Sequence, residues 1–309
     1  MIPHTAPPVW PEGTLRPGRF AGAIFSNTAD LLEDRDAADA LSKCLIALVG
    51  LPDDTGVELN HGRVGAKGGP HAFRAALARY GAAIPMDEGS DQPGYPRVFD
   101  AGDIIIGRDI RETHDRVTEV TLTLLEQGLF PIAIGGGHDL TFPFVRAVSR
   151  VHGTMSGLYL DAHLDVRPEV GSGMAFRSLV EGGFVNRLSV IGLDRLVNSR
   201  EHYEWFTSHG GSVGEGLTIL RAKSEDPAFV SLDLDVLDSA YAPGVSAKNP
   251  CGLSPWEVGD MIEAAGASAG VRCFDIMELN PVYDVDGRTA RVAAHMFLRF
   301  LRGFARRGG

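Results

Sequence analysis

The sequence contains little cysteine, with only three such residues among 309. Cys44, Cys251 and Cys273 lie far apart and form no CxxC pair, which argues against a zinc knuckle and against a disulfide framework. Cys44 and Cys273 fall in apolar runs, so we expect both thiols to be buried and reduced. This cysteine usage favours a cytoplasmic location.

The sequence also lacks a long apolar segment and an excess of basic charge. No apolar run approaches the roughly 20 residues that cross a bilayer, and the first residues do not resemble a secretory signal. The formal net charge is -11, whereas a nucleic-acid surface needs a basic patch. We therefore expect a protein that binds neither membranes nor nucleic acids.

The composition is that of a globular protein, with 44% apolar and 22% charged residues. Residues 1–40 are proline-rich at first and then acidic, and we expect them to form an N-terminal arm. No Pro/Gly/Ser-rich linker divides the remainder, so residues 41–309 are expected to form a single catalytic domain.

Short apolar runs alternate with helical patterns along this domain. Strands are predicted over Cys44–Val49, Val98–Ile106, Phe130–Ile134, Gly157–Leu160, Leu188–Ile191, Leu217–Leu220, Phe229–Leu234 and Val271–Ile276. Helices are predicted over Pro70–Arg79, Arg111–Gln127, Phe142–Val151 and Thr289–Arg302, and from a capping box at Ser254 and Glu257. This alternation indicates a parallel sheet covered on both faces, with its site at the carboxyl ends of the strands.

Histidine and aspartate follow two of these predicted strands. His138 comes after three glycines, which taken alone indicate only a Gly-rich loop with a hydrogen-bonded histidine. Asp161, His163 and Asp165 alternate, so in extended chain their side chains share one face. Carboxylates gathered at the end of a buried strand are costly unless a cation offsets them, although a solvated acidic loop is the alternative.

A third segment adds Asp233 and Asp235 after another apolar strand, where the alternative is an acid pair splayed into solvent. Together the three segments supply two imidazoles and four carboxylates, a set that suits manganese better than a thiolate-bound metal. Six ligands exceed what one ion with an open water position needs. The pattern therefore predicts two ions about 3.5–4 Å apart.

These segments, GGGHD, DAHLD and SLDLDVLD, resemble the signatures of the ureohydrolases, which include arginase, agmatinase and formiminoglutamase. The resemblance extends from about Gly62 to the last helix, and implies a three-layer α/β/α sandwich around a mostly parallel eight-stranded sheet. It implies two Mn²⁺ ions per chain. It assigns His138, Asp161, Asp165 and Asp233 to one ion, and Asp161, His163, Asp233 and Asp235 to the other. It also implies a homo-oligomer, a trimer or hexamer.

Within this family the chain is most similar to formiminoglutamases, through Asp165–Arg167, Ser172–Arg177 and Ala242–Ala247. Arginases carry a histidine where Phe176 stands. The resemblance implies hydrolysis of N-formimino-L-glutamate to L-glutamate and formamide, a step of histidine degradation. That anionic small molecule has two carboxylates, and arginine is suited to bind them. We therefore predict that Arg167 and Arg177 bind the substrate, with surface ion pairs as the alternative.

By the same resemblance, Glu278 would bind the protonated imino nitrogen and Asp165 would carry a proton to the departing amino group. The rival functions are those of an agmatinase, arginase or other guanidino-acid hydrolase that releases urea. A more distant rival is a non-catalytic metal-binding relative. We assign no role to His202, and we interpret Gly210–Gly214, which fits GxSxG, as a loop because no apolar strand precedes it.

Overall fold

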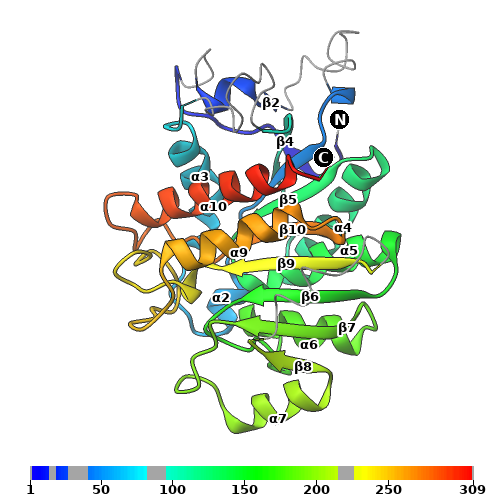
Figure 1. The fold of residues 1–309 in the computed structure, drawn as a ribbon, viewed down its shortest axis with the longest axis vertical. Helices are drawn as coiled ribbons and strands as arrows, with labels where there is room; N and C mark the ends of the chain where they lie inside the picture. The colour runs from blue at the N-terminus through cyan, green and yellow to red at the C-terminus, as the bar shows by residue number, and fades with distance from the viewer. Residues whose placement is uncertain (1, 14–18, 27–40, 82–94, 215–225, 308–309) are drawn as a thin grey trace.

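The structure is a computed structural model that describes residues 2–13, 19–26, 41–81, 95–214 and 226–307. Within these ranges the chain folds around one ten-stranded sheet (Figure 1). Its strands are β1 Thr5–Ala6, β2 Phe25–Ser26, β3 Ile46–Leu51, β4 Val98–Ile104, β5 Phe130–Gly135, β6 Met155–Leu160, β7 Val185–Ile191, β8 Gly211–Val213, β9 Ala228–Asp233 and β10 Val271–Met277.

The strand order is β1-β4-β3-β5-β10-β9-β6-β7-β8, and β2 also pairs with β4. Every described pairing is parallel except that of β1 with β4, which is antiparallel. The mostly parallel sheet is therefore confirmed. Eight of its strands have three or more residues, and the two-residue strands β1 and β2 bring the described total to ten.

Helices cover both faces of the sheet, which confirms the three-layer sandwich. Helices α3, α9 and α10 pack together over one face, with α9 and α10 in front in Figure 1, while α4, α5 and α6 pack over the other. The α-helices are α2 Thr55–Leu59, α3 Gly69–Leu77, α4 Ile110–Glu126, α5 Thr141–His152, α6 Ala175–Glu181, α7 Arg200–Ser208, α9 Pro255–Ala267 and α10 Arg288–Phe304.

The apolar strands owe their composition to burial on both faces. In β3, Ile46 and Leu48 belong to the core beneath α3, α9 and α10, whereas Ala47 and Val49 belong to the core on the other side. Successive side chains of a strand point to opposite faces, so a strand between two helical layers needs an apolar residue at every position.

Two smaller predictions are confirmed. Cys44 and Cys273 are buried free thiols, while Cys251 is exposed. Helix α9 begins with the expected capping box, in which the Ser254 hydroxyl accepts from the Glu257 N–H and the Glu257 carboxylate accepts from the Ser254 N–H. None of the helices in the described ranges is both long enough and apolar enough to cross a membrane.

The interpretation of residues 210–214 as a loop was wrong, because Gly211–Val213 form β8 and pair in parallel with β7. An edge strand has a partner on one side only, so this short polar segment joins the sheet without the apolar pattern that marks the inner strands. The predicted strand Leu217–Leu220 lies outside the described residues. Helices α2, α6 and α7 were not predicted.

Candidate metal centre

The predicted ligands gather because they follow neighbouring strands. Strands β5, β10, β9 and β6 lie side by side and run in parallel, so their carboxyl ends meet at one edge of the sheet. The turn after β5 requires glycine at position 136, since a Cβ there would lie 2.0 Å from the carbonyl oxygen of Asp53. This turn brings His138 back over the strand ends.

All six predicted ligands meet in two groups that share Asp161. One group contains His138, Asp161, Asp165 and Asp233, and the other contains Asp161, His163 and Asp235; within each group, one donor atom per residue lies within 4.8 Å of the rest. The geometry thus places Asp161 between the two groups. Asp233, the second bridge expected from the resemblance, falls in the first group only.

The hydrogen bonds of the buried His138 ring determine which of its nitrogens faces the first group. Its Nε2 lies 3.0 Å from the hydroxyl of Ser231, which in turn donates to Asp275. Because the hydroxyl proton goes to Asp275, Ser231 accepts from Nε2–H, and the lone pair of the imidazole is left on Nδ1. A carboxylate behind a ligating histidine is a common arrangement at metal sites.

The Nδ1 atom of His138 lies 3.2 Å from an oxygen of Asp161, 3.0 Å from Asp165 and 3.1 Å from Asp233. Among the residues that the structure describes, it nevertheless has no hydrogen-bond partner, and neither has the Asp161 oxygen that faces it. A lone pair that faces three carboxylates is repulsive unless a cation lies between them. The donor set therefore fits a divalent metal ion.

The same repulsion shifts the pKa values of the ligand side chains. Burial, together with the charges of Asp165 and Asp235, raises the pKa of Asp161 to about 6. Burial, together with the charges of Asp235 and Asp161, raises the pKa of Asp233 well above its usual value. Burial opposes a charge on His163, but the nearby Asp235 and Asp161 prevail and raise its pKa to about 12. Without metal, these side chains hold protons that a dication would replace.

The two predicted catalytic residues have unusual backbones. Asp165 has φ of 47° and Glu278 has φ of 65°, a left-handed conformation that non-glycine residues rarely adopt. Such conformations persist where the surrounding structure imposes them, and they concentrate at functional sites. In both positions the conformation directs a carboxylate towards the same cavity.

Glu278 is held at both of its carboxylate oxygens. Oε1 accepts a hydrogen bond from the backbone N–H of His138 at 3.0 Å, and Oε2 accepts from the hydroxyl of Ser246 at 2.5 Å. Burial raises the pKa of Glu278 to about 8, although Ser246 acts in the opposite direction. A cationic group in the cavity would favour the charged form, so this fixed, buried side chain is suited to bind one.

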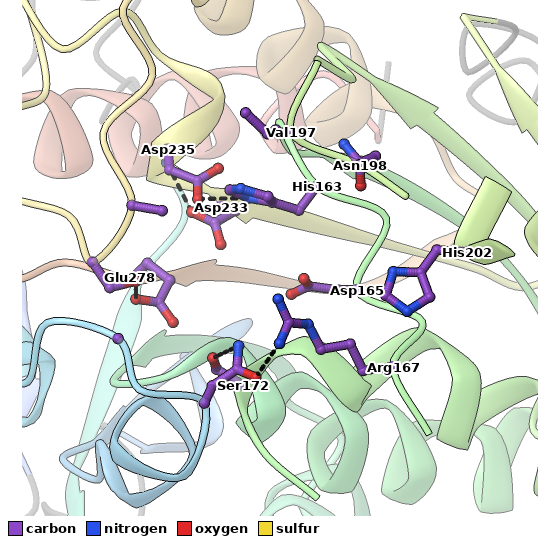
Figure 2. A pocket seen from close by; sticks show the side chains of 14 residues that line it. His163, Asp165, Arg167, Ser172, Val197, Asn198, His202, Asp233, Asp235 and Glu278 are labelled. Atoms are coloured by element: carbon purple, nitrogen blue, oxygen red, sulfur yellow. Dashed lines mark hydrogen bonds and ion pairs between the residues drawn. The ribbon is translucent and has the colours of Figure 1, made fainter. Parts of the chain in front are cut away.

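The ligands open onto a cavity of about 210 Å³ (Figure 2). It is lined by Asn60, Gly62, His163, Asp165, Arg167, Ser172, Val197, Asn198, His202, Asp233, Asp235, Ser246, Ala247 and Glu278. Sequence reasoning gave no role to Asn60, Asn198 or His202. Asn198 and His202 could have been suspected from the sequence, because they follow β7 and so lie at the same edge of the sheet as the metal ligands.

The two predicted substrate-binding arginines lie in different places. Arg167 lines the cavity and donates to the amide oxygen of Asn60 at 2.9 Å. Arg177 does not line it, because α6 directs this side chain to Glu181 at 2.8 Å and over the ring of Trp205 at 4.9 Å. The geometry therefore gives no support to substrate binding by Arg177, and that assignment stays a prediction.

Phe176 packs behind the metal ligands. Its buried ring stacks on Tyr159 with centroids 3.8 Å apart and meets the ring of His138 edge-on at 5.2 Å. An apolar ring in this position can support His138, but it cannot transfer a proton. The structure therefore gives Phe176 a packing role.

Asn198 fastens the loop that carries the central ligands. Its side-chain oxygen accepts from the N–H of Leu164 at 2.9 Å, and its side-chain nitrogen donates to the carbonyls of Ala162 at 2.8 Å and Asp194 at 2.7 Å. The backbone is thus held on both sides of His163. This loop would otherwise rely on backbone contacts such as Asp194 N–H to Ala162.

Comparison with known proteins gives consistent results. A family model described as the arginase family matches residues 45–302. The formimidoylglutamase of Ralstonia nicotianae is 32% identical over 100% of this chain and 99% of its own length, and that of Rhodococcus opacus is 32% identical over 85% and 87%. The mitochondrial agmatinase of Gallus gallus is 29% identical over 82% of this chain and 79% of its own length.

Solved structures agree with this pattern. Trypanosoma cruzi formiminoglutamase with Mn²⁺ superposes with a TM-score of 0.77 and 33% identity, covering 90% of this chain and 97% of that chain. The formimidoylglutamase of Bacillus subtilis has a TM-score of 0.75 and 25% identity, covering 85% and 88%.

Proposed function

The chain belongs to the arginase family, and from this premise we propose that it hydrolyses N-formimino-L-glutamate to L-glutamate and formamide with two manganese ions per chain. The observation that carries the proposal is the pair of ligand groups that share Asp161 and open onto a cavity lined by Arg167. The cavity joins a metal centre to a guanidinium, which suits an amidine that carries carboxylates.

The donor set agrees with manganese. Four carboxylates and two imidazoles, with no thiolate among them, are ligands that this ion accepts. The lone pair on Nδ1 of His138 faces three carboxylates and has no other partner. When bound, two such ions lower the pKa of a shared water and stabilise negative charge that develops on the substrate.

Glu278 and Asp165 have separate tasks in the proposed reaction. Glu278 is fixed by Ser246 and by the backbone of His138, so it can hold the cationic imino nitrogen while water adds to the formimino carbon. Asp165 takes a proton from the attacking water and delivers it to the amino nitrogen of glutamate as the carbon–nitrogen bond breaks. The products are glutamate and formamide.

An assay of products tests this function. The manganese-loaded chain is incubated with N-formimino-L-glutamate, agmatine, arginine and guanidino acids, and formamide and urea are measured separately. We expect formamide from the first compound and little urea from the others. Release of urea would identify a guanidino hydrolase, and no turnover despite bound manganese would favour the non-catalytic alternative.

Three broader features remain proposals. We propose that residues 41–309 form one catalytic domain preceded by an arm over residues 1–40, that the enzyme is cytoplasmic, and that it assembles as a trimer or hexamer. The described part of the chain contains no membrane-spanning helix, which is compatible with the proposed location. Light scattering coupled to gel filtration measures the oligomer directly.

A further inference from the structure

One guanidinium that lines the cavity has no acidic partner among the described residues. Within the described ranges, no carboxylate lies at ion-pairing distance from Arg167, whose guanidinium donates to the neutral amide of Asn60. Asn60 is held in turn by Ser172 at 3.2 Å. The arginine stem crosses Gly173, where a Cβ would lie 2.9 Å from its Cδ. Arg167 is thus held at the cavity, with its charge unpaired among the described residues.

A second basic side chain faces the same space. His202 lies in the first turn of α7, where its backbone N–H donates to the capping hydroxyl of Ser199 at 3.1 Å. Its imidazole lines the cavity and, among the residues that the structure describes, has no hydrogen bond or ion pair. In Figure 2, Glu278 lies at the left of the cavity, while Arg167 and His202 lie at the right.

In the proposed complex, two substrate carboxylates remain for Arg167 and His202 to bind. Four aspartates offset two dications, and Glu278 offsets the cationic amidine, so the two substrate carboxylates are left. Arg167 can bind one of them. Of the other basic side chains that line the cavity, His163 belongs to a ligand group, which leaves His202. A neutral imidazole is sufficient, since it still donates one N–H.

We infer that Arg167 and His202 together recognise the dicarboxylate end of the substrate, and that His202 is the specificity-determining donor for one carboxylate. This inference rests on the proposed function and names the substrate feature that the cavity selects. In N-formimino-L-glutamate the α-carboxyl carbon is three bonds from the reacting carbon and the distal one is five. The two groups therefore need separate donors, and we assign the distal carboxylate to His202.

Kinetics of two substrates test the assignment. The manganese-loaded chain and its His202→Ala, His202→Gln and His209→Ala variants are assayed with N-formimino-L-glutamate and with N-formimino-L-2-aminobutyrate, which lacks the distal carboxylate. His202→Ala is expected to raise KM for the first compound about 10- to 100-fold with kcat within about twofold, which is the usual range for a hydrogen bond to a charged group. KM for the second compound should not change.

The other variants separate recognition from folding. His202→Gln retains an N–H donor and should recover part of the lost affinity. His209 is exposed at the end of the same helix, against Trp205, so His209→Ala should match the unaltered chain on both substrates. Equal effects of His202→Ala on the two substrates, or no effect on either, would overturn the assignment.

Calorimetric binding of L-glutamate and L-2-aminobutyrate to the same manganese-loaded proteins distinguishes this inference from the proposed function. If glutamate binding depends on His202 but no formimino compound is hydrolysed, the function fails and the assignment stands. If N-formimino-L-glutamate is hydrolysed and glutamate binds equally well without His202, the function stands and the assignment fails.

Discussion

At the scale of single residues, Ser231 and Asp275 determine which nitrogen of His138 is available. Ser231→Ala leaves the Nε2–H of a buried imidazole without an acceptor and lets the ring adopt the other tautomer. We expect manganese to bind about 10- to 100-fold more weakly, the usual effect of losing a group behind a metal ligand. Titration of the metal-free protein with Mn²⁺ measures this.

Ser189 provides the matched control, because it is also a buried strand serine but its hydroxyl has no hydrogen-bond partner in the described part of the chain. Ser189→Ala should leave manganese affinity unchanged. If both variants bind the metal equally well, the hydrogen bond from His138 to Ser231 has no influence on the site.

Glu278 is the second residue whose role can be isolated. Glu278→Gln keeps the shape of the side chain and an acceptor for His138 N–H, but removes the charge that holds the substrate cation. We expect kcat/KM to fall by about 10²- to 10⁴-fold, with manganese content unchanged. Glu181→Gln, on the surface of α6, should behave like the unaltered chain. Turnover by Glu278→Gln within a few-fold of normal would exclude the proposed role.

Functional residues were easiest to predict from the sequence where they lie at the end of a buried strand. Asp161 and Asp233 could be found because each follows an apolar run, and such a run by itself indicates a buried strand. Asp275 could not be singled out, since it lies inside a strand and its partners Ser231 and Thr141 come from other elements. Arg177 was predicted from its loop position, the family resemblance and the two substrate carboxylates, and in the structure it contacts Glu181 and Trp205 instead of lining the cavity.

At the scale of elements, α9 and α10 approach each other through glycines. A Cβ on Gly266 would lie 2.2 Å from the carbonyl oxygen of Phe300, and one on Gly303 would lie 2.0 Å from that of Glu263. Gly266→Ala should therefore lower the free energy of unfolding by about 1–3 kcal/mol through overpacking, although alanine is the better helix former. Thermal or denaturant unfolding measures the change.

Gly259 in α9 is the matched control, because a Cβ there would meet its nearest neighbour, the Arg299 side chain, at an ordinary 3.5 Å. Gly259→Ala should leave stability unchanged or raise it by up to about 1 kcal/mol. A gain in stability from Gly266→Ala would mean that the two helices are not held at this separation.

Element boundaries were predictable where local signals are strong. The capping box at Ser254 fixed the start of α9 within a residue. Strand β8 was missed because its only pairing, with β7, joins residues more than twenty positions apart and leaves no apolar pattern in three residues. The order of the strands in the sheet likewise depends on such distant pairings, and it was not predicted.

At the scale of the whole molecule, the ionisable side chains of the site make the stability of the fold depend on pH and on metal binding. Burial raises the pKa of Asp161 to about 6 and that of Glu278 to about 8, while neighbouring aspartates overcome burial and raise that of His163 to about 12. In each case the folded chain holds a proton that the unfolded chain has released at lower pH. The metal-free protein should therefore lose stability as pH rises from 5 to 8.

Manganese displaces these protons, so its binding strengthens over the same range. We expect the difference in Tm between manganese-loaded and chelator-treated protein to widen from pH 5.5 to pH 8. Calorimetry at matched ionic strength measures it. A difference that is constant or narrows with rising pH would contradict this linkage.

The attachment of Asn198 to both sides of His163 has a consequence for redesign of the enzyme. The short connection from β7 to α7 carries Asn198, which braces the ligand loop, and leads four residues later to His202, which faces the substrate. Replacing this connection with that of a relative that prefers another substrate would change both His202, which faces the substrate, and Asn198, which supports the ligand loop. Retargeting should therefore vary position 202 alone and retain the asparagine.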